Sequence, residues 1–238
     1  SEVMHLAQLT ADAGGRYISH IRSEDRWFND ALEEIIEIGR VTGMPVQISH
    51  LKLAMASLWG RSPWIIQRLD AARAEGIDLT ADIYPYTYWQ ASMFVLLPER
   101  DPMDLAAIDF VMAELAPPDG IIFTHFPVEP SYVGMTLTEI AAVREQSPTE
   151  AFSALAQMSI AHETATGDVG DAVLGTSMRD DDIATFMAWP HTNICTDGGL
   201  HDRHPRGAGS FPRVLGRYVR EQGVLSLENA IHRMTALS

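Results

Sequence analysis

The sequence has little cysteine, few basic residues and no long apolar run. Cys195 is the single cysteine among 238 residues, which excludes an internal disulfide framework and a cluster of thiolate metal ligands. Lys and Arg number 17 against 32 Asp and Glu, giving a net charge of -15, so nucleic acid and anionic membranes are not expected as partners. No stretch approaches the roughly 18 consecutive apolar residues of a membrane helix. The first residues lack the basic start and apolar run of a signal peptide, so we expect a cytoplasmic protein.

What is present indicates an ordinary globular protein, since 46% of the residues are hydrophobic, enough for a sizeable core. Between residues 14 and 86 the pattern reads strand, helix, strand, helix, strand. Apolar residues at helical spacing predict a helix over 27–42 that stops at Gly43. A second helix is expected between an N-cap at Ser62 and a stop at Gly76. This alternation favours an α/β fold with parallel strands.

Residues 91–190 have a less regular pattern. We expect a helix over 102–116, a short strand over 120–126 and a helix over 178–188. Two further helices here begin with capping boxes, in which Ser or Thr is followed three residues later by Glu: Thr136 with Glu139, and Ser147 with Glu150. No linker divides the chain, so residues 1–238 are expected to form one domain in which about 91–190 is an insertion.

Three predicted strands end on a side chain that can bind a metal. The runs RYISH, PVQISH and NICTD end on His20, His50 and Asp197. Because the carboxyl ends of parallel strands meet at one face, these side chains are expected to converge. Imidazole and carboxylate groups are natural ligands of zinc or a similar divalent ion. On spacing alone, a structural role for the histidines is about as favoured as a ligand role, and Asp197 is favoured as a turn residue.

Longer motifs carry a resemblance to a known family. The runs GGRYISHIRSED, PVQISHLK, LTADIYPYT, TDGGLHDRHPRGAGSFPRVLGRYVRE and LSLENAIHRMTAL resemble the N-acyl-D-amino-acid deacylase (D-aminoacylase) family of the amidohydrolase superfamily. They occur in the family's order and extend over nearly the whole chain. The resemblance implies a metal-dependent (β/α)8 barrel accompanied by a small β-sandwich.

The resemblance covers only part of that barrel. The family's first strand carries a His-x-His pair, and a later cysteine also binds metal. This sequence has no His-x-His, and Cys195 lies too late in the chain. We therefore expect a partial TIM-like (β/α) barrel, roughly strands five to eight of a metal-dependent amidohydrolase, with the 91–190 insertion before the last strand. Activity is expected to require the missing N-terminal half.

The resemblance also implies a metal site. His20 and His50, on the fifth and sixth strands, are implied zinc ligands. Asp197, on the eighth strand, is the implied catalytic acid/base and a further ligand. A bound divalent ion would lower the pKa of water and polarise the amide carbonyl, while Asp197 would carry the proton to the leaving amine. Arg22 and Glu24 are expected at the rim of the site.

Three residues match family positions that bind substrate. Lys52 and Arg206 match positions that hold its free carboxylate, where Arg can make a bidentate contact. Tyr84 matches a position that donates its hydroxyl group to the substrate. Without the resemblance, Lys52 and Arg206 would be interpreted as ordinary surface charge.

These residues favour an enzyme that hydrolyses the amide bond of small N-acyl-D-amino acids with the help of a metal. Two alternatives stay open. One is a non-catalytic half-barrel that associates with itself or with the missing half, because an open parallel sheet exposes its edges. The other is a cyclic amidohydrolase such as a hydantoinase or dihydroorotase, which shares strand-end His and Asp residues. The YPYT and HPR motifs do not suit that second class.

Overall fold

The computed structural model describes residues 1–199 and 203–237, which form two compact units. The first unit combines Ser1–Tyr86 with the segment that begins at Met178, and the second consists of Thr87–Ser177. The second unit therefore corresponds in place to the insertion expected over 91–190, but it begins and ends earlier. All of the residues that the sequence assigns to a site lie in the first unit.

The first unit is built around a parallel sheet. Its order among the described residues is β1-β2-β3-β7, and its strands are short: β1 (Tyr17–Ser19), β2 (Val46–Ile48), β3 (Leu79–Ile83) and β7 (Thr192–Ile194). The register pairs Ser19 with Ile48 and Ile48 with Ala81, so β1 and β2 end at the same edge of the sheet. The parallel pairing confirms the α/β fold that the alternating pattern predicts.

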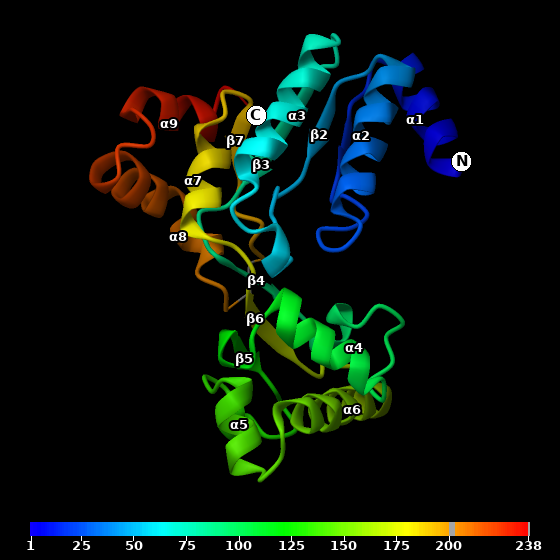
Figure 1. Ribbon diagram of the computed structural model, residues 1–238, viewed down its shortest axis with the longest axis vertical. Helices are drawn as coiled ribbons and strands as arrows, with labels where there is room; N and C mark the ends of the chain where they lie inside the picture. The colour runs from blue at the N-terminus through cyan, green and yellow to red at the C-terminus, as the bar shows by residue number, and fades with distance from the viewer. Residues whose placement is uncertain (200–202, 238) are drawn as a thin grey trace. The chain divides into compact units, whose positions relative to one another are not determined.

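Several helices pack on this sheet, and those between strands pack against the strand that follows them in the chain: α2 (Phe28–Thr42), α3 (Ser62–Ala74) and α7 (Asp180–Ala188). In Figure 1 they lie alongside one another over the strands. The apolar face of α2 buries Leu32, Ile35 and Ile36, which recur at helical spacing. Its predicted stop is confirmed, because Gly43 adopts the left-handed conformation (φ 68°) and donates to the carbonyl of Gly39.

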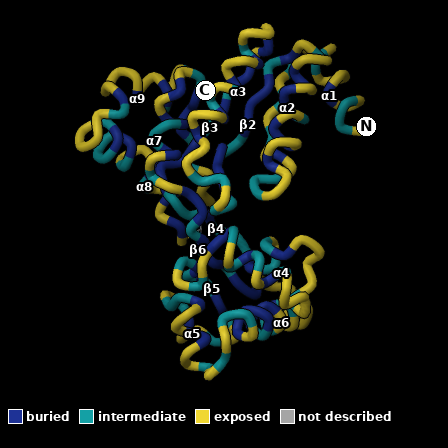
Figure 2. The backbone as a smooth tube through the Cα atoms, in the orientation of Figure 1, coloured by how far each residue is buried: buried dark blue, intermediate teal, exposed yellow. Residues whose placement is uncertain are grey.

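The first unit has further helices, most of which contribute side chains to the same hydrophobic core. They are α1 (Glu2–Asp12), the short 3-10 helix η1 (Ala56–Leu58), α8 (Arg206–Arg213), the π-helix η6 (Val214–Glu221) and α9 (Leu227–Met234). Figure 2 shows the central strands of this unit as largely buried. The core joins side chains from the sheet and from the helices, among them Phe28, Ile48, Phe186 and Tyr218, each at most 1% exposed.

The second unit has a different architecture. An antiparallel sheet in the order β4-β6-β5 contains β4 (Tyr88–Ala91), β5 (Ile121–His125) and β6 (Ala172–Thr176). Its helical segments are η2 (Met93–Leu96), α4 (Leu105–Phe110), η3 (Val111–Leu115), η4 (Pro118–Gly120), η5 (Pro130–Tyr132), α5 (Leu137–Val143) and α6 (Pro148–Thr166). Both predicted capping boxes are confirmed, with Thr136 as the N-cap of α5 and Ser147 as the N-cap of α6. Across the described parts of both units, no helix has the length and apolar character needed to cross a membrane.

Candidate metal and substrate site

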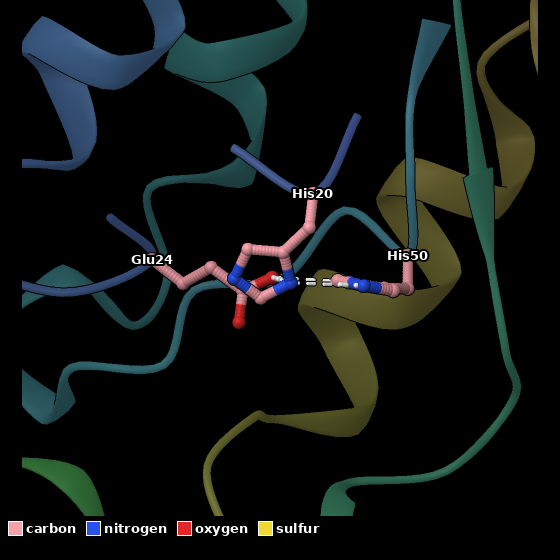
Figure 3. Close-up of side chains that lie close together, drawn as sticks. All are labelled: His20, Glu24 and His50. Atoms are coloured by element: carbon pink, nitrogen blue, oxygen red, sulfur yellow. Dashed lines mark hydrogen bonds and ion pairs between the residues drawn. The ribbon is translucent and has the colours of Figure 1, made fainter. Parts of the chain in front are cut away.

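Two histidines meet at the carboxyl edge of the parallel sheet. His20 directly follows β1, and His50 lies two residues beyond the end of β2. His20 Nδ1 lies 3.0 Å from His50 Nε2, and the ring planes are inclined at 64° (Figure 3). The parallel register thus brings together the two imidazoles that the sequence predicts as ligands.

Glu24 lies against both rings (Figure 3). One carboxylate oxygen, Oε1, is 3.0 Å from His50 Nδ1 and 3.8 Å from His20 Nδ1. Ligand atoms of the three residues lie within 4.8 Å of one another, a grouping that could hold a metal ion. The main-chain carbonyl of Glu24 accepts a hydrogen bond from the amide of Ala54, which ties the loop after β1 to the loop after β2. The sequence predicts Glu24 at the rim, whereas its carboxylate is a central member of the cluster.

Lys52 joins the same cluster from the loop after β2. Its ammonium nitrogen lies 2.8 and 3.0 Å from the two oxygens of Glu24 and 2.7 Å from His50 Nδ1. Lys52 is only 4% exposed, so it is not an ordinary surface charge. Burial by itself would raise the pKa of Glu24, but the Lys52 ammonium and the hydrogen bond from His50 outweigh it and lower that pKa to about 2. Partial desolvation lowers the pKa of His20, which favours the neutral ring that binds metals.

The main chain of His50 is held in an unusual conformation. Its φ of 38° lies in the left-handed region, which is unfavourable for a residue other than glycine. Asp82 stabilises it, because Oδ1 of that side chain accepts from the His50 amide at 2.6 Å. The second oxygen of Asp82 accepts from Gln47 Nε2 at 2.7 Å. Burial, followed by the nearby Asp82 carboxylate, raises the pKa of the Cys195 thiol, which keeps this thiol protonated.

A second group of predicted residues gathers at the end of β7. Asp197, three residues beyond that strand, also has a left-handed main chain (φ 48°). Arg206 Nη1 donates to Asp197 Oδ2 at 2.5 Å. Arg206 is 7% exposed, and its main-chain amide donates to His204 Nδ1 at 2.9 Å. Both predicted residues therefore belong to a half-buried ion pair rather than to the solvent-facing surface.

Tyr84 connects the two groups. Its ring centroid is 5.6 Å from Lys52 Nζ and 4.8 Å from the guanidinium carbon of Arg206. These are cation–π distances for both cations. Burial raises the pKa of Tyr84 well above its ordinary value, against the opposing effect of Arg206, so the hydroxyl group keeps its proton. The structure thus places all six predicted site residues in one connected set.

Comparison with known proteins places this site in context. No family model matches the chain. It is 34% identical over its whole length to the N-acyl-D-glutamate deacylase of Alcaligenes xylosoxydans xylosoxydans and covers 43% of that protein. The D-aminoacylase of the same organism is 30% identical, with the same coverage of both chains. Over its whole length, the chain is similar to the D-aminoacylases.

Solved structures of these deacylases superpose on the fold. A zinc-containing N-acyl-D-glutamate deacylase from Bordetella bronchiseptica, complexed with a phosphonate inhibitor that mimics the tetrahedral intermediate, matches 99% of this chain with a TM-score of 0.79 and 34% identity. A crystal structure of D-aminoacylase matches the same share with a TM-score of 0.76 and 30% identity. In each case the match covers 44% of the solved chain. The chain therefore spans less than half the length of the deacylases that it matches, and the resemblance predicted from its motifs is confirmed.

Proposed function

We propose that this chain supplies half of the active site of a metal-dependent deacylase that hydrolyses N-acyl-D-amino acids. It would form strands five to eight of the catalytic barrel, with Thr87–Ser177 inserted before the last of them. The observation that carries the proposal is the contact between His20 and His50 at the ends of two parallel strands, 3.0 Å apart. The zinc and phosphonate complex of a homologue with 34% identity supports it.

The donor atoms fit a divalent metal. Two nitrogens bound to one zinc at about 2.0–2.1 Å in tetrahedral geometry lie about 3.3 Å apart. His20 Nδ1 and His50 Nε2 are 3.0 Å apart, so a small outward movement of either ring satisfies this geometry. His20, His50 and Asp197 would hold the ion, and further ligands would come from the part of the protein outside this chain. When bound, the ion supplies a Lewis acid that polarises the amide carbonyl and acidifies water.

Asp197 is the proposed acid/base of the reaction. As a carboxylate it takes a proton from the attacking water and then returns it to the nitrogen of the leaving amine. Its left-handed main chain fixes the direction of the side chain at the end of β7. The ion pair with Arg206 orients the carboxylate between turnovers.

The substrate carboxylate is proposed to bind between two cations. Arg206 Nε is buried and has no hydrogen-bond partner among the described residues, so a donor is left for a ligand. Lys52 supplies a second positive charge, and both cations contact the ring of Tyr84. The protonated hydroxyl group of Tyr84 can donate a further hydrogen bond to the substrate.

The metal part of this function is tested on the purified chain. Zinc content after equilibration is measured for the wild type and for His50→Ala. We expect the wild type to retain zinc and the variant to lose it. Equal zinc content in the two proteins would remove His50 from the site.

The catalytic part is tested in a chimaera, in which this chain replaces the matching segment of the Alcaligenes N-acyl-D-glutamate deacylase. Release of acetate from N-acetyl-D-amino acids is expected from the chimaera and not from the chain alone. Substantial turnover by the chain alone would contradict the proposal that it holds only half of the site. A folded, zinc-loaded chimaera with no turnover would contradict the deacylase assignment.

A further inference from the structure

The side chains of His20, Glu24, His50 and Lys52 form one cluster. Glu24 is the member of this cluster to which the resemblance assigns no ligand or substrate role. Its side chain is 14% exposed and makes two kinds of contact. Both oxygens accept from the ammonium group of Lys52, and Oε1 also lies 3.0 Å from His50 Nδ1. One carboxylate therefore touches a proposed metal ligand and a proposed substrate-binding residue at the same time.

The contact between Glu24 and His50 affects which nitrogen of the His50 ring carries the proton. A neutral imidazole has one nitrogen that carries a proton and one with a free lone pair. If Nε2, the nitrogen that faces His20, is the metal ligand, Nδ1 must carry the proton and needs an acceptor. Glu24 Oε1 is an acceptor at the right distance. Lys52 Nζ, 2.7 Å from the same nitrogen, can only donate and so favours the opposite tautomer.

Glu24 therefore competes with His50 Nδ1 for the protons of Lys52. By accepting from the ammonium group with both oxygens, it offers Lys52 a charged partner in place of the imidazole. The same carboxylate compensates the positive charge that would otherwise repel a metal ion beside His50. The main chain of Glu24 is held separately, because its carbonyl accepts a hydrogen bond from the amide of Ala54, and the side chain reaches both partners from this anchored position.

We infer that Glu24 is a positioning residue that holds His50 in the tautomer with a free Nε2 and fixes Lys52 for the substrate carboxylate. The inference rests on the proposed function, since it assigns Glu24 a role toward the metal ligand and the substrate cation of that same site. It predicts that metal affinity depends on a side chain that need not contact the metal. Carboxylates that orient a metal-bound histidine commonly contribute about ten- to hundredfold to metal affinity.

The test is the zinc dissociation constant of the purified chain, measured by chelator competition. Glu24→Gln is expected to weaken zinc binding about ten- to hundredfold. Glu33→Gln is the matched control, because it removes the same charge from an ion pair with Arg68 on the outer face of α2. Affinities of the two variants within about twofold of each other would overturn the inference. If Glu24→Gln does not fold by circular dichroism, Glu24→Asp, which is too short to reach both partners, is compared with Glu33→Asp by the same criterion.

A double variant separates the two contacts. Lys52→Met alone is expected to leave zinc affinity unchanged or higher, because it removes a cation beside the site. Glu24→Gln combined with Lys52→Met should still bind zinc at least about tenfold more weakly than Lys52→Met alone. Equal affinity of these two variants would show that Glu24 only neutralises Lys52, and it would overturn the inference. A wild-type chain that binds zinc no better than His50→Ala would instead contradict the metal site itself.

Discussion

Arg206 and Asp197 are paired through a hydrogen bond of 2.5 Å between Nη1 and Oδ2, at the end of the last strand of the parallel sheet. The proposed binder of the substrate carboxylate and the proposed proton carrier thus neutralise each other. In the proposed reaction, a substrate carboxylate competes with Asp197 for the guanidinium group. Binding of the substrate would therefore release Asp197 toward the attacking water, which couples recognition to proton transfer.

Replacing Asp197 by Asn should abolish most of the turnover in the chimaera. The amide is isosteric with the carboxylate but cannot take up a proton, and general acid/base groups contribute about 10²–10⁴-fold to rate. We expect kcat to fall by that factor, while KM stays unchanged or falls, because Arg206 no longer pairs with a carboxylate. Steady-state hydrolysis of N-acetyl-D-amino acids measures both constants. Asp168→Asn, an exposed acid of the second unit, is the control, and an equal kcat in the two variants would exclude the proton-transfer role.

Replacing Arg206 by Lys should mainly weaken substrate binding. Lys keeps the positive charge but loses the planar fork that can bind a carboxylate with two nitrogens. Because a hydrogen bond to a charged group contributes about 1.5–3 kcal/mol, KM is expected to rise roughly ten- to hundredfold, with a smaller change in kcat. The same kinetic assay on Arg179→Lys, an exposed arginine, gives the control. A loss confined to kcat would assign Arg206 to catalysis instead.

Replacing Asp82 by Ala should destabilise the fold around His50. The His50 amide would lose its acceptor while its main chain remains in the left-handed region. An unsatisfied part-buried donor costs about 1–3 kcal/mol, and we expect the free energy of unfolding to fall by that amount in urea denaturation. Asp78→Ala, whose side chain is 57% exposed, should change it by less than about 0.5 kcal/mol. Equal stabilities would show that Asp82 does not hold His50.

The capping box of α6 should make the stability of the second unit depend on pH. The Ser147 amide and then its hydroxyl group donate to Glu150 and lower the pKa of that carboxyl below its ordinary value. A lowered pKa in the folded state contributes stability above the unfolded pKa, and this contribution is lost as pH falls through the folded value. Glu150→Gln keeps the hydrogen bonds but removes the titration. The wild type should therefore be the more stable protein at neutral pH and lose that advantage in acid.

Denaturant unfolding at several pH values, followed by circular dichroism, checks this dependence. Glu145→Gln removes the same charge outside the capping box and serves as the control. A difference between wild type and Glu150→Gln that stays constant down to strongly acidic pH would contradict the role of the ionised carboxylate.

The features that could be predicted from the sequence are those that local chemistry decides. Gly43 ends α2 because only glycine enters the left-handed region without cost, and this is readable from one residue after an apolar periodic run. The capping boxes at Thr136 and Ser147 depend on a spacing of three residues within one helix turn. The meeting of His20 and His50 follows from strand polarity, because parallel strands end at one edge.

The features that could not be predicted depend on contacts between distant segments. Glu24 stands in a polar turn, and nothing in that turn indicates that its carboxylate meets Lys52 from another loop. Asp82, on β3, accepts a hydrogen bond from the amide of His50 in the loop after β2, and the sequence around neither residue indicates this contact. The strand β6 contains Gly175, and the ring of Trp89 on β4 occupies the space where a side chain of residue 175 would lie. A strand at this glycine therefore depends on packing against β4, which the local sequence does not reveal.

The first and last residues of the second unit are hydrogen-bonded to each other, because the amide of Ser177 donates to the carbonyl of Thr87 at 2.9 Å. Its entry and exit points therefore coincide, and β3 and β7 pair directly in the parallel sheet on either side of it in the chain. We therefore expect that a change in the length of Thr87–Ser177 leaves the order of the strands before the histidines and Asp197 unchanged.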